Sequence, residues 1–336
     1  MNHQKYLCRI AAGCLALSLS FACVACHNRK DAEDVETSGT EEKGQDMERA
    51  SQASTVTAEA DREIQDKDTK DLSEEVTTEA VEESIPEDRT ISWDSDWEYA
   101  EFSKIHDSDV NLYYSHVENR KEKVVAVNAG HGTEGGSSVK TQCHPDGSAK
   151  VTGGTTSSGA TEAYAVSSGM EFLDGTEERD ATLSAALLLK EKLLENGYDV
   201  LMIRETEDTQ LDNIARTVYA NEFADCHIAL HYDSTENDKG AFYMSVPDVD
   251  SYRSMEPVAS HWQEDNALGD ALIWGLEEEG VSIFGDGSME ADLTQTSYST
   301  IASVDLEIGD AASSYDEDTQ SRICDGILEG LDRLWE

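Results

Sequence analysis

A stretch of 60 residues without an aromatic side chain limits where this chain can fold. Residues 31–90 contain no Phe, Trp, Tyr or His, and they carry 21 acidic residues against 6 basic ones. A segment with few large apolar groups and a high net charge cannot bury enough surface to offset the entropy lost on folding. We therefore predict that residues 27–90 form a disordered acidic linker, which repulsion between its charges keeps extended.

The residues before this linker are typical of an export signal. Lys5 and Arg9 precede the short apolar run LALSLSFACVAC, which ends in small residues. The run is too short to span a membrane comfortably, so residues 1–26 are predicted to be a signal peptide. Its end, Val-Ala-Cys26, resembles a bacterial lipobox, which implies a lipid anchor on Cys26 at the outer face of the cell membrane, in the cell-wall zone. Cys23 is the second candidate, and an ordinary cleaved signal peptide is the alternative.

Charge and cysteine content exclude two other classes of protein. The chain has 336 residues with 25 Lys and Arg against 71 Asp and Glu, which gives a formal charge of −46. Binding to nucleic-acid phosphates needs a basic surface, so we expect no nucleic-acid partner. Only Cys143, Cys226 and Cys324 lie beyond the signal region. Three widely spaced cysteines neither build a disulfide framework nor match a cysteine-type zinc site.

Aromatic residues return near residue 91, and from there apolar runs alternate with helical patterns. The patterns predict strands at 124–128, 198–204, 227–232, 241–246 and 301–308, and helices at 178–196, 213–224, 267–279 and 318–335. Such alternation predicts an α/β fold, a single domain with a mixed, mostly parallel twisted sheet covered by helices. We assign residues 121–336 to this domain and residues 91–120 to an N-terminal extension that packs on it.

Two parts of the predicted domain give more specific expectations. In the helix 178–196, one face is expected to carry Leu183, Ala186, Leu187, Lys190, Leu193 and Leu194. Residues 132–175 are rich in Gly, Ser and Thr, and they are predicted to form a long loop over the end of the first strand. A structureless segment of this length inside a domain is usually functional or mobile.

Three polar residues fall at the ends of predicted elements. His131 follows the first strand between two glycines, Glu178 begins the first helix, and His231 lies near the end of the strand 227–232. In open α/β sheets, ligands gather outside the carboxyl ends of the strands. Two imidazoles and one carboxylate form a catalytic zinc shell that leaves a position open for water. Taken alone the pattern is a weak indication, because a histidine at a strand end is more often an ordinary polar residue.

Four motifs together resemble a known family. They are VVAVNAGHG at 124–132, EERDATLSAALLLKEKLLENGYDVLMIRE at 177–205, ARTVYANEFADCHIALHYDS at 215–234 and SVDLEIGD at 303–310. In this order they are similar to the zinc-dependent N-acetylmuramoyl-L-alanine amidases of the amidase-3 type, and the resemblance covers residues 121–336. It implies a cell-wall hydrolase with peptidoglycan as its partner and one Zn²⁺ as its cofactor. The bond implied is the amide between N-acetylmuramic acid and the L-alanine of the stem peptide.

The resemblance also implies roles for individual residues. His131, Glu178 and His231 match the metal ligands of the family, and Glu307 matches its catalytic carboxylate. For Glu178 the ordinary reading is a first-turn acid favoured by the helix dipole. A carboxylate such as Glu307 inside the apolar run 304–308 is costly unless it has a partner, which favours a catalytic role.

Nearby polar residues are expected to be structural. His227 shares a strand face with His231, but the family has an apolar residue at its position. Arg204 and Arg216 are expected to orient loops through ion pairs, and Asn221 to make local hydrogen bonds.

Two of the motifs depart from the family pattern. Asn128-Ala129 stands where the family usually has Asp-Pro, and Asp310 follows Gly309 where an aromatic residue is common. The second departure leaves the packing beside the catalytic strand open. Two alternative functions also stay open, a catalytically weak peptidoglycan-binding or regulatory lipoprotein, and a zinc peptidase acting within the stem peptide. Whether an activator protein must move the loop 132–175 is a further open point.

Overall fold

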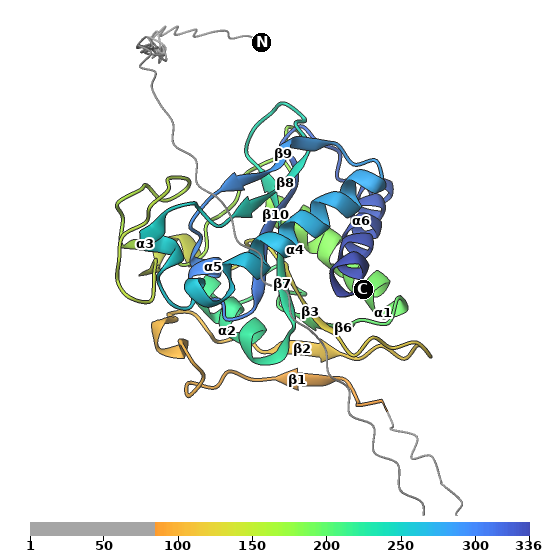
Figure 1. Cartoon of the computed structure of the whole chain (residues 1–336), viewed down its shortest axis with the longest axis horizontal. Coiled ribbons are helices and arrows are strands. Elements are labelled where there is room, and N and C mark those ends of the chain that lie inside the picture. Colours follow the sequence, from red (N-terminus) through yellow and green to blue (C-terminus); the bar gives the residue numbers. More distant parts are fainter. Residues whose placement is uncertain (1–84) are drawn as a thin grey trace, which may run out of the picture. The chain divides into compact units, whose positions relative to one another are not determined.

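An eight-stranded sheet runs through the part of the chain that the computed structural model describes, residues 85–336 (Figure 1). The strands follow the order β1 (Arg89–Ile91), β2 (Val110–Tyr113), β6 (Asp199–Met202), β3 (Val124–Ala129), β7 (Cys226–Asp233), β10 (Ala302–Asp310), β8 (Ala241–Ser245) and β9 (Ile283–Glu290). The central strands β6, β3, β7 and β10 are parallel, β9 is parallel to β8, and the remaining pairs are antiparallel. The predicted mixed, mostly parallel sheet is therefore confirmed. The predicted signal peptide, the lipid anchor and the linker up to residue 84 lie outside the described residues.

One face of the central sheet is apolar. Side chains of alternate residues in β3, β7 and β10 point to it, and they are Val125, Val127, Ala129, Ile228, Leu230, Val304, Leu306 and Ile308. Three helices cover this face: α1 (Glu178–Glu195), α4 (Val258–Glu278) and α6 (Glu317–Trp335). Figure 1 shows α4 and α6 packed side by side. Burial of apolar surface between these layers is the main favourable contribution to folding.

The opposite face of the same strands carries polar side chains. The intervening residues of β3, β7 and β10 include Asn128, His227, His231, Ser303, Asp305 and Glu307. Helix α2 (Asn213–Phe223) and the short helix α5 (Thr294–Tyr298) pack on this side, where Arg216 contacts Asn128 and Gln295 contacts Ser303. Because side chains alternate between the two faces along each strand, these polar residues lie on one face of the sheet and the apolar core lies on the other.

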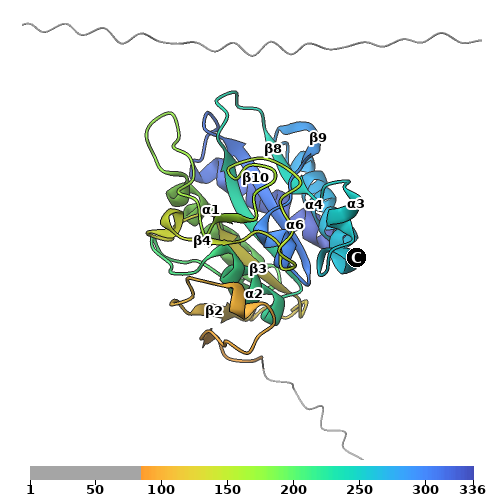
Figure 2. The same cartoon turned by 90° about the vertical axis from the view of Figure 1, so that its left-hand side faces the viewer.

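The predicted helices and strands are present, and most of their ends agree to within two residues. The exception is α4, which begins at Val258, well before the predicted residue 267. Strands β1, β2 and β9 were not predicted. Figure 1 labels β1 and β2 next to each other at one edge of the sheet, and Figure 2 shows the orange part of the chain around β2 at the same edge. Among residues 85–336, no helix has the length and apolar character needed to cross a membrane. Cys143, Cys226 and Cys324 are buried free thiols.

The buried face of α1 differs from the predicted one. The buried residues of this helix include Ala181, Thr182, Ala185, Ala186, Leu189 and Leu193. The predicted stripe is only partly right, because Leu183, Leu187, Lys190 and Leu194 are half-buried at its margin. The buried face therefore combines small residues such as Ala181 and Ala185 with Leu189 and Leu193, which are both buried.

The segment 132–175 is tied down by a distant carboxylate and is not structureless. It contains a 3-10 turn (Gly136–Ser138) and a small hairpin of β4 (Lys140–Gln142) and β5 (Glu162–Tyr164). Asp292, which is fully buried, accepts hydrogen bonds from the backbone N–H groups of Val151 and Thr152. It also pairs with Lys150, with Nζ 2.9 Å from Oδ1. A residue about 140 positions away along the chain therefore fixes this segment.

Candidate metal centre

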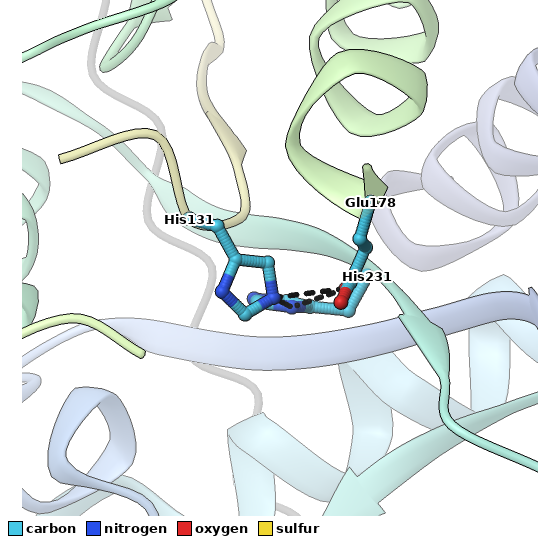
Figure 3. Close-up of side chains that lie close together, drawn as sticks. All are labelled: His131, Glu178 and His231. Atoms are coloured by element: carbon cyan, nitrogen blue, oxygen red, sulfur yellow. Dashed lines mark hydrogen bonds and ion pairs between the residues drawn. The ribbon is translucent and has the colours of Figure 1, made fainter. Parts of the chain in front are cut away.

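Three side chains from separate elements converge at the carboxyl end of the central strands. His131 follows β3, Glu178 opens α1, and His231 belongs to β7, and Figure 3 shows them pointing toward one another. The Nε2 atom of His131 lies 2.9 Å from Oε1 of Glu178 and 3.0 Å from Nδ1 of His231. The last side of this triangle, from His231 Nδ1 to Glu178 Oε1, is 3.1 Å. The structure thus brings together the three residues that the sequence singled out.

The backbone around His131 is shaped to let the three groups meet. His131 has a φ of 63°, a left-handed conformation that residues with a side chain seldom adopt outside functional sites. Gly130 lies directly under the ring of His231, because a Cβ atom at this position would be 2.4 Å from the Cε1 atom of that ring. The glycine before His131 therefore makes room for the other imidazole.

Hydrogen bonds to the surrounding backbone orient His131 and Glu178. The Nδ1 atom of His131 lies 2.9 Å from the carbonyl oxygen of Ser167, so Nδ1 carries the proton and Nε2 presents a lone pair. The carboxylate of Glu178 accepts hydrogen bonds from the backbone N–H groups of Tyr232 and Met170, each at 2.9 Å. The lone pairs of both residues are therefore directed at the same point.

Two further carboxylates face this point from β10. Glu307 stands opposite His231 in the parallel register, is 8% exposed, and its Oε2 atom has no hydrogen-bond partner. Asp305 lies two residues earlier on the same strand face, with Oδ2 3.7 Å from Nε2 of His231. Asp305 was not predicted as a site residue, although its spacing of two from Glu307 in a predicted strand places both side chains on one face.

The pKa values show how strongly anionic this region is. Burial, together with the charge of Asp305, raises the pKa of Glu307 well above its usual range. Burial acts against ionisation of Glu178, but its hydrogen bonds with His131 and His231 outweigh this effect and lower its pKa. Burial likewise opposes the charge on His231, yet Asp305 and Glu178 raise its pKa to about 10. Positive charge is therefore favoured where these side chains meet.

The donor set fits a bound zinc ion. Two imidazole nitrogens and one carboxylate oxygen, each about 3 Å from the others, can all lie about 2.0–2.2 Å from a single ion. Among residues 85–336, no Lys or Arg forms an ion pair with Glu178 or Asp305, whose charged partners are histidines. A divalent cation would balance these buried carboxylates, and nitrogen and oxygen donors in this combination suit zinc.

Two fully buried arginines hold the backbone that carries His131. Arg216 donates hydrogen bonds to the side-chain oxygen of Asn128 and to the carbonyl oxygens of Ala129 and His131, at 2.9, 3.0 and 2.6 Å. Arg204 donates to the carbonyl oxygens of Ala129, Gly130 and Arg179, the last of which is next to Glu178. Burial lowers the pKa of Arg204 to about 10 and that of Arg216 to about 9.

The predicted ion pairs of these arginines are wrong, although their predicted role in orienting loops agrees with the contacts. Within residues 85–336 neither Arg204 nor Arg216 pairs with a carboxylate, and their main partners are carbonyl oxygens. The chain leaves the sheet after Ala129, so the carbonyls beyond it lose their ladder partners and need other donors.

The structure gives a physical account of both departures from the family pattern. Asn128 is the side-chain acceptor for Arg216. Asp310 is fully buried and accepts hydrogen bonds from the backbone N–H groups of the loop between β7 and β8, at Asn237, Asp238 and Lys239. The register of β10 against β7 shifts between Glu307 and Asp310. The carboxylate of Asp310 therefore lies just beyond the site, where it fixes the loop. Beside the strand that carries Glu307, the loop is therefore held by hydrogen bonds to Asp310.

Two other residues of the motifs lie away from the convergence point. His227 is fully buried, and its Nδ1 atom lies 3.4 Å from the hydroxyl of Ser303. Asn221 donates to the carbonyl oxygen of Tyr298 and accepts from the N–H of Thr300. These contacts are local and join neighbouring elements.

The fold and the geometry define an α/β protein with a candidate metal centre at the carboxyl ends of its strands. The sequence profile of the Amidase_3 family, described as N-acetylmuramoyl-L-alanine amidase, matches residues 125–332. The chain therefore belongs to the N-acetylmuramoyl-L-alanine amidase family and is an enzyme of that class, acting on peptidoglycan.

Two solved structures have a similar fold. One is the apo form of the amidase Ami1 from Mycobacterium abscessus, with 18% sequence identity and a TM-score of 0.50, covering 64% of this chain and 99% of that one. The other is Ami1 from Mycobacterium smegmatis, with 15% identity and a TM-score of 0.51, covering 65% of this chain and 98% of that one. At these identities the likeness concerns the fold alone. No curated protein sequence matches this chain.

Proposed function

We propose that this amidase hydrolyses the bond between the lactyl group of N-acetylmuramic acid and the L-alanine of the stem peptide, using water activated by one zinc ion. The observation that carries the proposal is the convergence of His131 Nε2, Glu178 Oε1 and His231 Nδ1 at about 3 Å from one another. When bound there, zinc would polarise the carbonyl group and make water more acidic. An unstrained amide needs both effects to be attacked at neutral pH.

The side chains of this proposed site divide the work. His131, His231 and Glu178 would hold the ion, and the backbone hydrogen bonds to His131 and Glu178 would keep two of the three donors in place. Glu307 would accept the proton of the attacking water as the carbon–oxygen bond forms. The same carboxyl would then give the proton to the departing nitrogen as the carbon–nitrogen bond breaks. The products would be a lactyl carboxylate and a stem peptide with a free L-alanine amino terminus.

A pocket beside the metal site supports substrate binding there. It has a volume of about 250 Å³ and is lined by residues 132–135, 166–171 and others, including Ser167, which hydrogen-bonds His131. The pocket therefore opens next to the first proposed ligand, where one arm of a stem peptide or glycan could lie. A hydrolase needs such a surface to hold the bond to be cut in line with the attacking water.

Digestion of purified peptidoglycan tests this proposal directly. The full-length protein would be incubated with the polymer after zinc loading, after treatment with a chelator, and after zinc is returned. We expect new L-alanine amino termini beside intact glycan strands, loss of the products with the chelator, and their return with zinc. Cleavage within the stem peptide would identify a peptidase instead, and a zinc-loaded protein without any product would support a binding role.

We also propose that a lipid on Cys26 holds the enzyme at the outer face of the cell membrane, in the cell-wall zone. The lipobox-like end of the apolar run supports this location. In cells, Cys26→Ser is expected to move the protein from the membrane fraction to the medium, while the matched variant Cys23→Ser stays in the membrane fraction. The reverse pattern would assign the anchor to Cys23, and release of neither variant would contradict lipid anchoring.

A further inference from the structure

The proposed mechanism gives no task to Asp305, although this residue faces the metal site. Its side chain is 16% exposed, and its Oδ1 atom is buried without a hydrogen-bond partner. Among residues 85–336, His231 is the only group that pairs with this carboxylate, across the 3.7 Å between Oδ2 and Nε2. A buried carboxylate with so few partners costs stability, so its presence needs an explanation in function.

The sheet places Asp305 against the side of the His231 ring that does not face the other ligands. In the parallel register Asp305 lies opposite Ala229 and Glu307 lies opposite His231. Ala229 and His231 point to the same face of β7, and the methyl group of Ala229 leaves space for a carboxylate beside the ring. The Nδ1 atom of His231 contacts His131 and Glu178, whereas Nε2 contacts Asp305.

The chemistry of imidazole connects these two sides. A neutral histidine that offers the Nδ1 lone pair to a metal must carry its proton on Nε2. A buried N–H group needs an acceptor, and Asp305 Oδ2 is the nearest carboxylate oxygen to Nε2 of His231. A side-chain rotation that shortens the separation by about 0.8 Å would bring the two atoms into hydrogen-bond range.

We propose that Asp305 is a positioning residue, which accepts a hydrogen bond from Nε2–H of His231 and so fixes the ring with Nδ1 toward the metal. This inference rests on the proposed zinc site. Carboxylates in such positions fix the ring orientation and raise the basicity of the ligating nitrogen. The two carboxylates of β10 then have different tasks, because Asp305 acts through His231 and Glu307 acts on water and substrate.

Zinc affinity of the metal-free protein tests the inference without measuring turnover. The full-length wild type, Asp305→Ala and Asp305→Asn would be titrated with zinc in competition with a chromogenic chelator. We expect Asp305→Ala to weaken zinc binding by about 10- to 100-fold. The loss in Asp305→Asn should be smaller, because its amide oxygen can still accept a hydrogen bond from Nε2–H.

Glu307→Gln is the matched control, since it makes the same carboxylate-to-amide change two residues away on the same strand face. Its zinc affinity is expected to stay within about 2-fold of the wild type, since within residues 85–336 no hydrogen bond or ion pair joins the Glu307 side chain to His231, and the two residues are linked only by the strand pairing. Nitrogen NMR of the zinc-loaded protein adds a second readout, in which the Nε2–H signal of His231 should shift in Asp305→Ala. Thermal unfolding of the metal-free variants shows whether the fold is kept.

The outcomes separate this inference from the function on which it rests. A wild type that binds no zinc would overturn the proposed function itself. If the wild type binds zinc and Asp305→Ala binds it equally tightly, only the proposed role of Asp305 would be overturned. Equal weakening in the Asp305 and Glu307 variants would point to a general loss of negative charge and would likewise contradict a specific hydrogen bond.

Discussion

Replacing Glu307 by glutamine is expected to lower the turnover of peptidoglycan by about 10²- to 10⁴-fold, the usual contribution of a general acid–base group. Glutamine has the same shape as glutamate, but its amide can neither accept the proton of the attacking water nor return it to the leaving nitrogen. Glu307 sits opposite His231, with one carboxylate oxygen free of other partners, so the lost function is chemical and not structural. Zinc should remain bound at the wild-type level.

Glu329→Gln provides the control for this variant, since Glu329 is exposed on α6 and the change in chemistry is the same. Its turnover should match that of the wild type. Product formation from labelled peptidoglycan and the zinc content of both proteins would be measured side by side. A Glu307→Gln enzyme that turns over normally would remove this residue from the mechanism, and a variant that lost its zinc would make it a ligand.

Replacing Arg216 by methionine is expected to destabilise the protein by about 4 kcal/mol, because each buried acceptor left without a donor costs about 1–3 kcal/mol. The side chain donates hydrogen bonds to Asn128 and to the carbonyl oxygens of Ala129, His131 and Leu211. Methionine fills similar space but donates none of them. For a domain of this size the midpoint of thermal unfolding should fall by roughly 8–16 °C.

Arg322→Met is the matched control, because Arg322 is an exposed residue of α6. Surface changes of this kind usually alter stability by less than about 0.5 kcal/mol. Unfolding would be followed by calorimetry on the metal-free forms, and zinc affinity would be measured below the transition. Since Arg216 holds the carbonyl of His131, its loss should also weaken zinc binding. Equal unfolding midpoints for the two variants would show that the buried hydrogen bonds do not support the fold.

The parts of the fold that follow local rules were predictable from the sequence. The apolar run before His131 became β3, and the periodic segment after Glu178 became α1, because each pattern matches one secondary structure over its whole length. Strand β9 escaped prediction, since Gly285 and Gly287 have positive φ values and most of its side chains are exposed. An edge strand with little burial lacks the alternation on which such predictions depend.

The residues of the candidate metal centre were predictable, but the hydrogen bonds that hold them in place were not. The order of the motifs indicated His131, Glu178 and His231, and the structure brings them within 3.1 Å of one another. The partners of Arg204 and Arg216 were not predictable, because a sequence does not show which backbone carbonyls leave the sheet without a donor. Contacts with large sequence separation depend on the finished fold.

The hydrogen bonds around His131 and Glu178 have a consequence for how the enzyme responds to its supply of metal. The carbonyl of Ser167 accepts a hydrogen bond from His131, backbone N–H groups donate to Glu178, and Arg216 holds the carbonyl of His131, so the proposed ligands would be preorganised and zinc would not have to fold the loop around itself. Domains that fold only when they bind zinc lose their structure in a chelator. Here the metal would govern activity separately from folding, and an enzyme starved of zinc could recover as soon as the ion returned.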